Sequence, residues 1–330
     1  MNPAASLQIA GVIVAAALNG GCLSLTPLPD QAPVSDRIEP ITKARYLLYV
    51  PSIYSDRRTW PLVVACHGTP PWDEAKWQMR EWAQFAEDEG IIVAAPFLIG
   101  TGGFLPPPPA EQIERQRRDE RAIVAIVNRL RSDYRIAREQ VFMTGWSAGA
   151  FAVLHTGLRN PDLFRALAIR QGNFDERFMD VASHQLDRWQ PVLVILGRTD
   201  MMRDQAKQCI EWLQDRGQFV ESDEQTGSHR RLNPGIVWGF FQKIVRERPW
   251  IRIVHLPDSR TPLTVRFSVE SVPSGAARKW FFGDGKESSD PVAVHTYERP
   301  GRYEVTANVA LDMGKIFGRT RTIDIGIEGG

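Results

Sequence analysis

The chain has 330 residues, of which 43% are hydrophobic and 24% are charged. This is an ordinary globular composition, and the length is sufficient for two domains. The net charge is only +1, so charge gives no reason to expect a nucleic acid or an acidic polymer as a partner.

The N-terminal segment has the pattern of an export signal. Residues 9–18 form an apolar run that is too short to span a bilayer but suits the core of a signal peptide. Small residues follow, and the segment Leu18-Asn-Gly-Gly-Cys22 resembles a lipoprotein processing site. We therefore expect residues 1–22 to be a lipoprotein signal, the protein to be exported to the cell envelope or secreted, and Cys22 to attach it to a membrane. An ordinary cleaved signal peptide is the alternative. Residues 23–40, rich in Pro, Ser and Asp, predict a linker.

From residue 45 the chain alternates apolar strands with amphipathic helices. The strands are predicted over residues 45–50, 61–66, 91–96, 141–144, 166–170, 191–196 and 217–221, and the helices over residues 74–89, 111–133, 147–158, 203–216 and 234–247. This alternation predicts an α/β fold over residues 41–250, with a mostly parallel sheet covered by helices on both faces. The Gly- and Pro-rich residues 99–110 predict a long loop, and such loops are often functional.

Gly145-Trp-Ser147-Ala-Gly149 has the pattern G-x-S-x-G. It lies between an apolar strand and a helix, where a serine at a sharp turn holds its hydroxyl clear of both elements. The flanking positions must be almost free of side chain because strand and helix pass closely there. The pattern predicts that Ser147 is a catalytic nucleophile.

A serine hydroxyl needs a base to take its proton and a carboxylate to orient that base. Asp200 follows an apolar strand through a Gly turn, and His229 lies in a loop of small residues after the last strand. This gives the order serine, acid, histidine, and the carboxyl ends of parallel strands meet at one edge of the sheet. We predict Asp200 and His229 as the partners of Ser147, with Asp175 as the rival acid.

Acyl transfer also needs two N–H donors for the oxyanion. We predict the backbone of Ala148 for one donor and that of Thr69, in the loop after His67, for the other. His67 itself is expected to be a structural hydrogen-bonding residue. The aromatic residues expected to line the substrate pocket, with core packing as the equal alternative, are Trp72, Phe104 and Trp146.

The three cysteines have no metal-binding spacing, so we expect neither a metal nor a cofactor. Cys66 and Cys209 are most simply buried thiols, and a disulfide between them is the less favoured alternative.

Residues from about 40 to 250 resemble an α/β-hydrolase of the secreted esterase type, a group that includes feruloyl and acetylxylan esterases and polyhydroxybutyrate depolymerase-like proteins. The matching residues are His67-Gly68, Tyr134-Arg-Ile, Gly145-Trp-Ser147-Ala-Gly149, Gly197-Arg-Thr-Asp200 and His229. The resemblance implies a serine carboxylic ester hydrolase that acts through an acyl-enzyme on a polysaccharide-linked ester or a polyester. Many relatives carry a longer Gly-rich or Cys-containing oxyanion loop where this chain has Thr69-Pro-Pro, which leaves the substrate open.

Beyond residue 253 strand-like alternation replaces helical spacing, and short strands with Gly and Pro turns predict a β-sandwich over residues 253–328. Lys279-Trp-Phe-Phe-Gly-Asp-Gly285, His295-Thr-Tyr297 and Pro300-Gly-Arg-Tyr-Glu-Val305 resemble the signature of a PKD domain. That resemblance implies that Trp280 packs in the core and that Gly283-Asp-Gly285 forms a tight turn. It also implies contact with a polysaccharide or the cell envelope, with a passive spacer as the alternative.

Two other functions remain open. One is a serine peptidase of the prolyl-oligopeptidase type, which we disfavour because no propeller precedes the hydrolase part. The other is a non-catalytic binding protein of the cell envelope, which the intact order of serine, acid and histidine argues against.

Overall fold

A computed structural model describes residues 32–103, 107–181, 186–231, 233–312 and 314–326. The predicted signal over residues 1–22, with Cys22, lies outside the described residues, as does Phe104. Within the described ranges, no helix is both long enough and apolar enough to cross a membrane.

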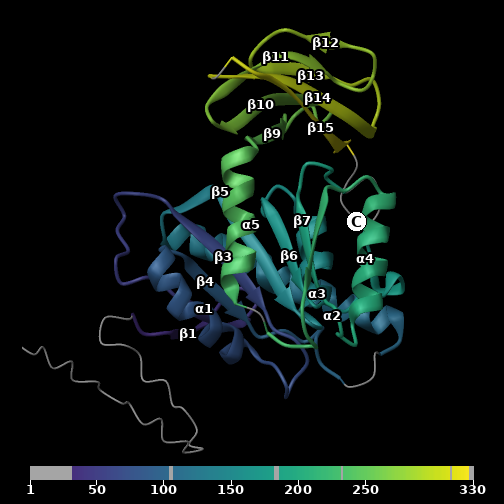
Figure 1. Ribbon diagram of the computed structural model, residues 1–330. Coiled ribbons are helices and arrows are strands. Elements are labelled where there is room, and N and C mark those ends of the chain that lie inside the picture. The colour runs from purple at the N-terminus through teal and green to yellow at the C-terminus, as the bar shows by residue number, and fades with distance from the viewer. Residues whose placement is uncertain (1–31, 104–106, 182–185, 232, 313, 327–330) are drawn as a thin grey trace, which may run out of the picture.

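An eight-stranded sheet forms the centre of the larger part of the molecule (Figure 1). Its strands lie in the order β1-β2-β4-β3-β5-β6-β7-β8. The strands β3 to β8 all run parallel to one another, while β1 and β2 pair antiparallel at one side of the sheet. Their bounds are β1 (Ser35–Ile38), β2 (Arg45–Tyr49), β3 (Trp60–Cys66), β4 (Ile92–Pro96), β5 (Ile136–Trp146), β6 (Ala166–Arg170), β7 (Val192–Gly197) and β8 (Val220–Gln225). The central strands are buried along their whole length because both faces of the sheet are covered.

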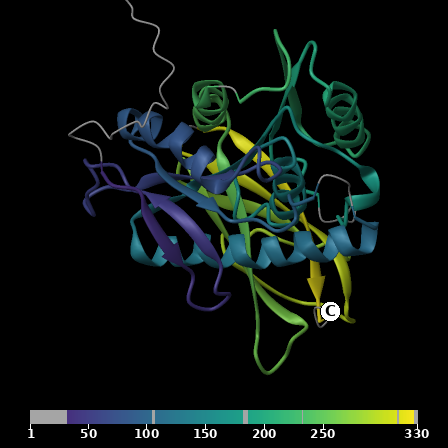
Figure 2. The same cartoon turned by 90° about the horizontal axis from the view of Figure 1, so that it is seen from below.

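Helices pack on both faces of this sheet, as Figure 2 shows for α2 on one side and α1 and α5 on the other. One face carries α1 (Ala75–Glu89) and α5 (Pro234–Glu247), whose apolar side chains share a core with the strands. The other face carries α2 (Pro109–Asp133), α3 (Gly149–Ala152) with the π-helical turn η1 (Val153–Gly157), and α4 (Arg203–Asp215). The predicted α/β fold, with a mostly parallel sheet covered on both faces, is confirmed.

Several elements differ from the sequence prediction. The strand predicted over residues 141–144 is longer and forms β5 from Ile136 to Trp146. Ser35–Ile38, expected in a linker, forms β1 and pairs antiparallel with β2. The sequence did not predict this strand because it is short, mostly exposed and without apolar alternation. The last strand of the sheet is Val220–Gln225 rather than residues 217–221, because Gly217 turns the chain with a φ of +71° and the strand itself is polar. The helix after Ser147 is not uniform but passes from α3 into η1.

The C-terminal part is a sandwich of two antiparallel sheets, β13-β10-β9 and β12-β11-β14-β15. The strands are β9 (Trp250–Pro257), β10 (Thr264–Val272), β11 (Gly275–Phe281), β12 (Glu287–Ser288), β13 (Ala293–Thr296), β14 (Gly301–Leu311) and β15 (Ile316–Ile325). Trp280 is fully buried in its core, as expected. Gly283 and Gly285 both have positive φ, as a tight turn requires, and a Cβ at Gly283 would lie 2.8 Å from the Glu304 carbonyl oxygen.

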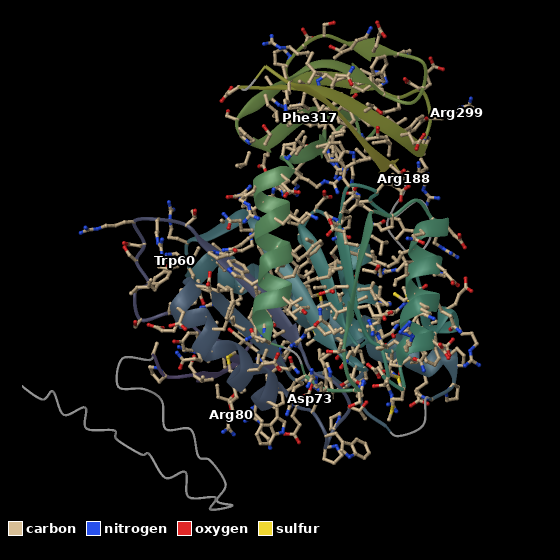
Figure 3. The ribbon with its side chains drawn as sticks, in the orientation of Figure 1. Trp60, Asp73, Arg80, Arg188, Arg299 and Phe317 are labelled. Atoms are coloured by element: carbon tan, nitrogen blue, oxygen red, sulfur yellow. The ribbon has the colours of Figure 1, made fainter. Side chains whose placement is uncertain are left out.

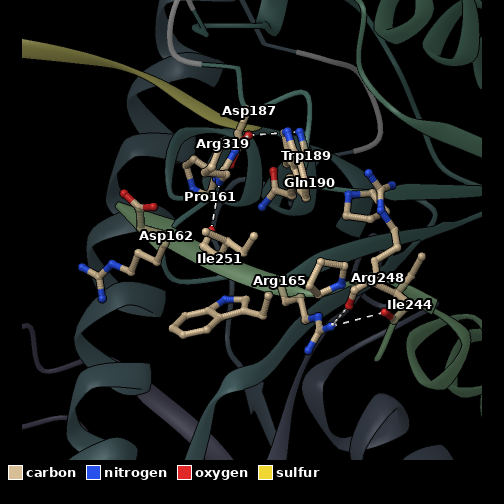
Figure 4. A pocket seen from close by; sticks show the side chains of 14 residues that line it. Pro161, Asp162, Arg165, Asp187, Trp189, Gln190, Ile244, Arg248, Ile251 and Arg319 are labelled. Atoms are coloured by element: carbon tan, nitrogen blue, oxygen red, sulfur yellow. Dashed lines mark hydrogen bonds and ion pairs between the residues drawn. The ribbon is translucent and has the colours of Figure 1, made fainter. Parts of the chain in front are cut away.

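The sandwich docks at the end of the sheet where the parallel strands begin. Figure 3 shows Asp73, which lies beyond the carboxyl ends of the strands, far from Phe317 of β15. At the junction, Arg319 of β15 pairs with Asp187, and both side chains are almost fully buried. Arg319 Nη1 donates to Asp187 Oδ1 at 2.6 Å and its Nε donates to the Ile251 carbonyl at 2.9 Å (Figure 4). A cavity of about 40 Å³ remains beside this pair.

Asp187 is ionised in this junction. Burial alone would raise the pKa of its carboxyl, but the charge and hydrogen bonds of Arg319 outweigh burial and hold the pKa below its usual range. Arg321 reinforces the pair, with Nη1 lying 3.5 Å from Asp187 Oδ2. A buried ion pair therefore joins the sandwich to the α/β part of the chain.

Cys66, at the end of β3, and Cys209, on α4, are both buried free thiols. The alternative of a disulfide between them is wrong. Burial raises the pKa of both thiols, so neither is a reactive thiolate.

Candidate active site

Ser147 occupies a sharp turn between β5 and α3, and its backbone φ is +53°. The two flanking glycines are required by close backbone approach. A Cβ at Gly145 would lie 2.5 Å from the Gly149 carbonyl oxygen, and a Cβ at Gly149 would lie 2.6 Å from the Cys66 carbonyl oxygen. The G-x-S-x-G pattern therefore results from the crossing of α3 over the ends of β3 and β5.

The structure brings together Ser147, His229 and Asp200. His229 Nε2 lies 2.9 Å from Ser147 Oγ, and His229 Nδ1 lies 2.9 Å from Asp200 Oδ1. Asp200 is almost fully buried, and its Oδ1 also accepts the backbone N–H of Met202 at 2.8 Å. This arrangement lets the imidazole accept a proton from the serine hydroxyl while the carboxylate holds the other ring nitrogen.

Gln171 holds the loop that carries His229, a role that the sequence prediction missed. Its Nε2 donates to the Ser228 carbonyl at 3.0 Å, and its Oε1 accepts the backbone N–H of Arg230 at 2.7 Å. Both neighbours of His229 are thus fixed by one buried amide. Trp146 stacks on the imidazole, with ring centroids 4.7 Å apart.

A cavity of about 280 Å³ adjoins the nucleophile. Thr69 and Ala148, the two predicted oxyanion donors, both line it. Among the hydrogen bonds found within the described residues, none uses the backbone N–H of Thr69 or of Ala148. Phe151, Phe174 and Phe178 supply apolar side chains to the lining of the cavity.

Asn173 is a second residue that the sequence prediction missed. Its backbone N–H donates to the Ser147 carbonyl at 3.1 Å, and its side-chain oxygen lies 3.3 Å from Ser147 Oγ. It also lines the cavity, so it stands between the nucleophile and the space for the substrate. Its position three residues after the end of β6 was the available signal, since the other site residues also follow strand ends.

The loop before Thr69 is fixed by buried polar groups. The Asp73 carboxylate is fully buried and accepts the backbone N–H of Gly68 at 2.7 Å. His67 Nε2 accepts the backbone N–H of Leu98 at 2.9 Å, so the proton of the neutral ring is on Nδ1, which lies 2.8 Å from the Gly68 carbonyl. Burial lowers the pKa of His67, which supports the structural role expected for it.

The Esterase family model matches residues 40–269, which is well over half of the chain, and the PKD domain model matches residues 249–326. The chain belongs to the Esterase family. The prediction of an ester-hydrolysing enzyme with a C-terminal PKD domain is confirmed.

Solved structures share the fold of this esterase. A CE1 ferulic acid esterase from Anaeromyces mucronatus has a TM-score of 0.51 and 18% identity, over 64% of this chain and 88% of that one. Another ferulic acid esterase has a TM-score of 0.50 and 14% identity, over 65% and 97% of the two chains.

A protein assigned as a dipeptidyl aminopeptidase IV from Bacteroides ovatus has a TM-score of 0.50 and 16% identity, over 66% of this chain. The esterase spans only 35% of that longer chain. At these identities the likeness shows the fold alone. No curated protein sequence matches the chain.

The rival acid of the esterase, Asp175, is bonded to Arg177 and not to His229. Its carboxylate accepts the backbone N–H of Arg177 at 3.0 Å and pairs with the Arg177 guanidinium, whose hydrogen bonds lower the Asp175 pKa. Asp175 lines the cavity but is bonded to Arg177, whereas Asp200 is bonded to His229.

Two of the aromatic residues predicted to line the substrate pocket, Trp146 and Trp72, lie in different surroundings. Trp146 packs against His229 and is almost fully buried. Trp72 is 61% exposed and lies outside the lining of the cavity, so it is not a wall of the acyl space. Within the described part of the chain, no group of three or more His, Cys, Asp or Glu side chains is arranged to hold a metal ion.

Proposed function

We propose that this esterase cleaves carboxylic esters through an acyl-enzyme on Ser147. His229 takes the proton of the Ser147 hydroxyl as Oγ bonds to the ester carbonyl carbon. The resulting oxyanion is stabilised by the backbone N–H groups of Thr69 and Ala148. His229 then gives the proton to the departing alcohol oxygen, the C–O bond breaks, and the acyl group stays on Ser147.

A water molecule completes the cycle. His229 takes a proton from this water, the hydroxide attacks the acyl carbon, and Ser147 recovers its proton when the acid is released. Asp200 orients His229 and stabilises its cationic form without becoming protonated. The observation that carries this proposal is the pair of 2.9 Å contacts that join Ser147 Oγ to His229 and His229 to Asp200.

The direct test compares the wild type with Ser147→Ala on p-nitrophenyl acetate. We expect a burst of p-nitrophenol equal to one per active site in rapid mixing, with both the burst and the steady turnover lost in Ser147→Ala. Mass spectrometry of the acid-quenched wild type should locate an acetyl group on the peptide that contains Ser147. Ester turnover that survives unchanged in Ser147→Ala would refute the proposal.

We further propose that the natural substrate is a polysaccharide-linked ester or a polyester, and that the protein is an exported lipoprotein whose PKD domain contacts a polysaccharide or the envelope. The apolar run over residues 9–18 followed by Cys22 supports export. A panel of feruloyl, acetyl-xylan and hydroxybutyrate esters tests the substrate. Fatty-acid labelling and cell fractionation of the wild type and Cys22→Ala test the anchor, and sedimentation of full-length Ser147→Ala with insoluble polysaccharide tests the contact.

A further inference from the structure

The proposed mechanism determines on which side of Ser147 the alcohol portion of the ester lies, and the inference that follows rests on that mechanism. The leaving oxygen must receive its proton from His229 Nε2, so the alcohol lies on the His229 side of the nucleophile. The cavity on the Asn173 side is lined by neither His229 nor Trp146, and it suits the acyl group. What surrounds His229 therefore contacts the alcohol.

One aromatic ring packs on His229, and a guanidinium lies near both that ring and a second aromatic ring. Trp146 stacks on the imidazole. The guanidinium carbon of Arg231 lies 5.8 Å from the centroid of Trp146 and 5.8 Å from that of Trp77. Arg231 is only two residues beyond His229 and belongs to the same loop, so its position is set together with that of the base.

Arg231 is held in place by a buried carboxylate. Its Nη1 donates to Asp73 Oδ1 at 2.9 Å, while Asp73 Oδ2 accepts N–H groups of Gly68 and Gln78 at 2.7 Å each. Asp73 is fully buried, whereas the Arg231 side chain is 37% exposed. In the described parts of the chain, Asp73 is the one acceptor of an Arg231 hydrogen bond. A guanidinium has five N–H donors, so a pre-oriented group retains donors for a ligand.

The surroundings of Trp77 are also cationic. Lys76 Nζ and the Arg80 guanidinium lie 5.3 and 5.8 Å from the centroid of the Trp77 ring. Arg80 is labelled at the lower edge of the molecule in Figure 3, near Asp73. The acids of the same segment are Asp73, which is bonded to Arg231, and Glu74, which pairs with Lys76 at 3.0 Å. A further acid, Glu81, is close enough to Arg231 to interact with its charge and pairs with the buried Arg170.

We propose that Arg231 and Trp77, next to Trp146, form a subsite for the alcohol portion of the ester, and that this subsite selects ring-bearing alcohols that carry a carboxylate. Trp146 is almost fully buried against His229 and helps to position Arg231. The half-buried indole of Trp77 offers an apolar face for a ring, and the fork of Arg231 matches a carboxylate with two parallel hydrogen bonds. Because Asp73 and the two rings fix the guanidinium before binding, little side-chain entropy is lost when a carboxylate binds.

The test uses two esters with the same acyl group and nearly the same shape. These are 4-acetoxybenzoate, whose leaving alcohol carries a carboxylate, and 4-acetoxybenzamide, whose leaving alcohol is neutral. We define the charge preference as kcat/KM for the first divided by kcat/KM for the second. In Arg231→Gln we expect this preference to fall about tenfold from the wild-type value, as the loss of a charge-assisted hydrogen bond requires. The ratio cancels a general loss of activity from the unpaired Asp73.

Three further measurements separate the outcomes. Arg231→Lys should keep most of the charge preference, and Arg302→Gln, which removes a paired surface arginine of the PKD domain, should not change it. Raising the salt concentration should reduce the preference in the wild type, since salt screens exposed charges. An unchanged preference in Arg231→Gln, with Ser147-dependent turnover of both esters, overturns the subsite but not the proposed function. Absence of any Ser147-dependent turnover overturns both.

Discussion

The turn that presents the Ser147 hydroxyl to His229 holds the Ser147 backbone in a strained conformation. A φ of +53° is unfavourable for a residue with a side chain and costs on the order of 1–3 kcal/mol. The conformation is held by hydrogen bonds on both sides of the residue, since the Ser147 N–H donates to the Arg170 carbonyl at 3.1 Å and the Ser147 carbonyl accepts the N–H groups of Ala150 and Asn173. The strain is therefore local, and the surrounding sheet and helix maintain it.

At the same scale, we predict that Asp200→Asn lowers kcat by roughly 10⁴-fold, because an amide beside Nδ1 favours the wrong tautomer of His229. The measurement is kcat on p-nitrophenyl acetate, with circular dichroism to verify the fold. Asp175→Asn is the matched control, since its carboxylate is bonded to Arg177. A large loss in Asp175→Asn together with an active Asp200→Asn would reassign the acid.

Among the elements, α2 controls one wall of the cavity through Asp119. The Asp119 carboxylate accepts the backbone N–H groups of Ile99 at 2.9 Å and Gly100 at 2.7 Å, and Gly100 to Gly103 line the cavity. Burial raises the Asp119 pKa to about 6, even though these two hydrogen bonds lower it. The folded protein thus binds this proton more tightly than the unfolded chain does.

This proton makes stability depend on pH. Between the ordinary pKa of 3.8 and about 6 the folded state holds the Asp119 proton while the unfolded state does not. The contribution of Asp119 is therefore greatest below pH 3.8, falls as the pH rises through this window, and is constant above it. We predict that the free energy of unfolding of Asp119→Asn, relative to the wild type, rises between pH 4 and pH 6. Urea denaturation at pH 4, 5 and 6 measures the difference, and a flat difference would contradict the prediction.

For the whole molecule, the docking of the PKD domain on the starting ends of the strands separates it from the chemistry. The parallel strands are five to eleven residues long, so a strand's length of roughly 16–36 Å lies between the starting ends and the carboxyl ends of the strands. Residues of the PKD domain contribute nothing to the lining of the cavity beside Ser147. The described residues of the domain therefore lie away from the reacting groups.

We predict that removal of the chain after Pro249 leaves kcat/KM for p-nitrophenyl acetate within about threefold, measured well below the melting temperature. This cut precedes β9, whereas a cut at residue 253 would leave half a strand behind. The truncated protein should nevertheless melt at a lower temperature, because the junction around Asp187 becomes exposed. Loss of activity in a truncated protein that circular dichroism shows to be folded would mean that the domain shapes the site.

The buried ion pair at the junction gives a separate prediction. Arg319→Met should lower the free energy of unfolding by about 3 kcal/mol, since it leaves Asp187 buried with only Arg321 nearby. Adding Asp187→Leu should recover part of the loss, because no carboxylate then remains buried. Urea unfolding of the single and double variants measures this. Equal stability of Arg319→Met and the wild type would show that the junction does not depend on the pair.

The sequence by itself determined the α/β-hydrolase fold and the β-sandwich, and it predicted Ser147, Asp200 and His229, which the structure brings within hydrogen-bonding distance of one another. It could do so because each of these follows from local pattern: apolar periodicity, two glycines beside a serine, and polar residues placed after strand ends. Only the tertiary structure revealed the contacts of Gln171, Asn173 and Arg231 around the site. Their partners lie on segments far away in the chain, so no local pattern marks them.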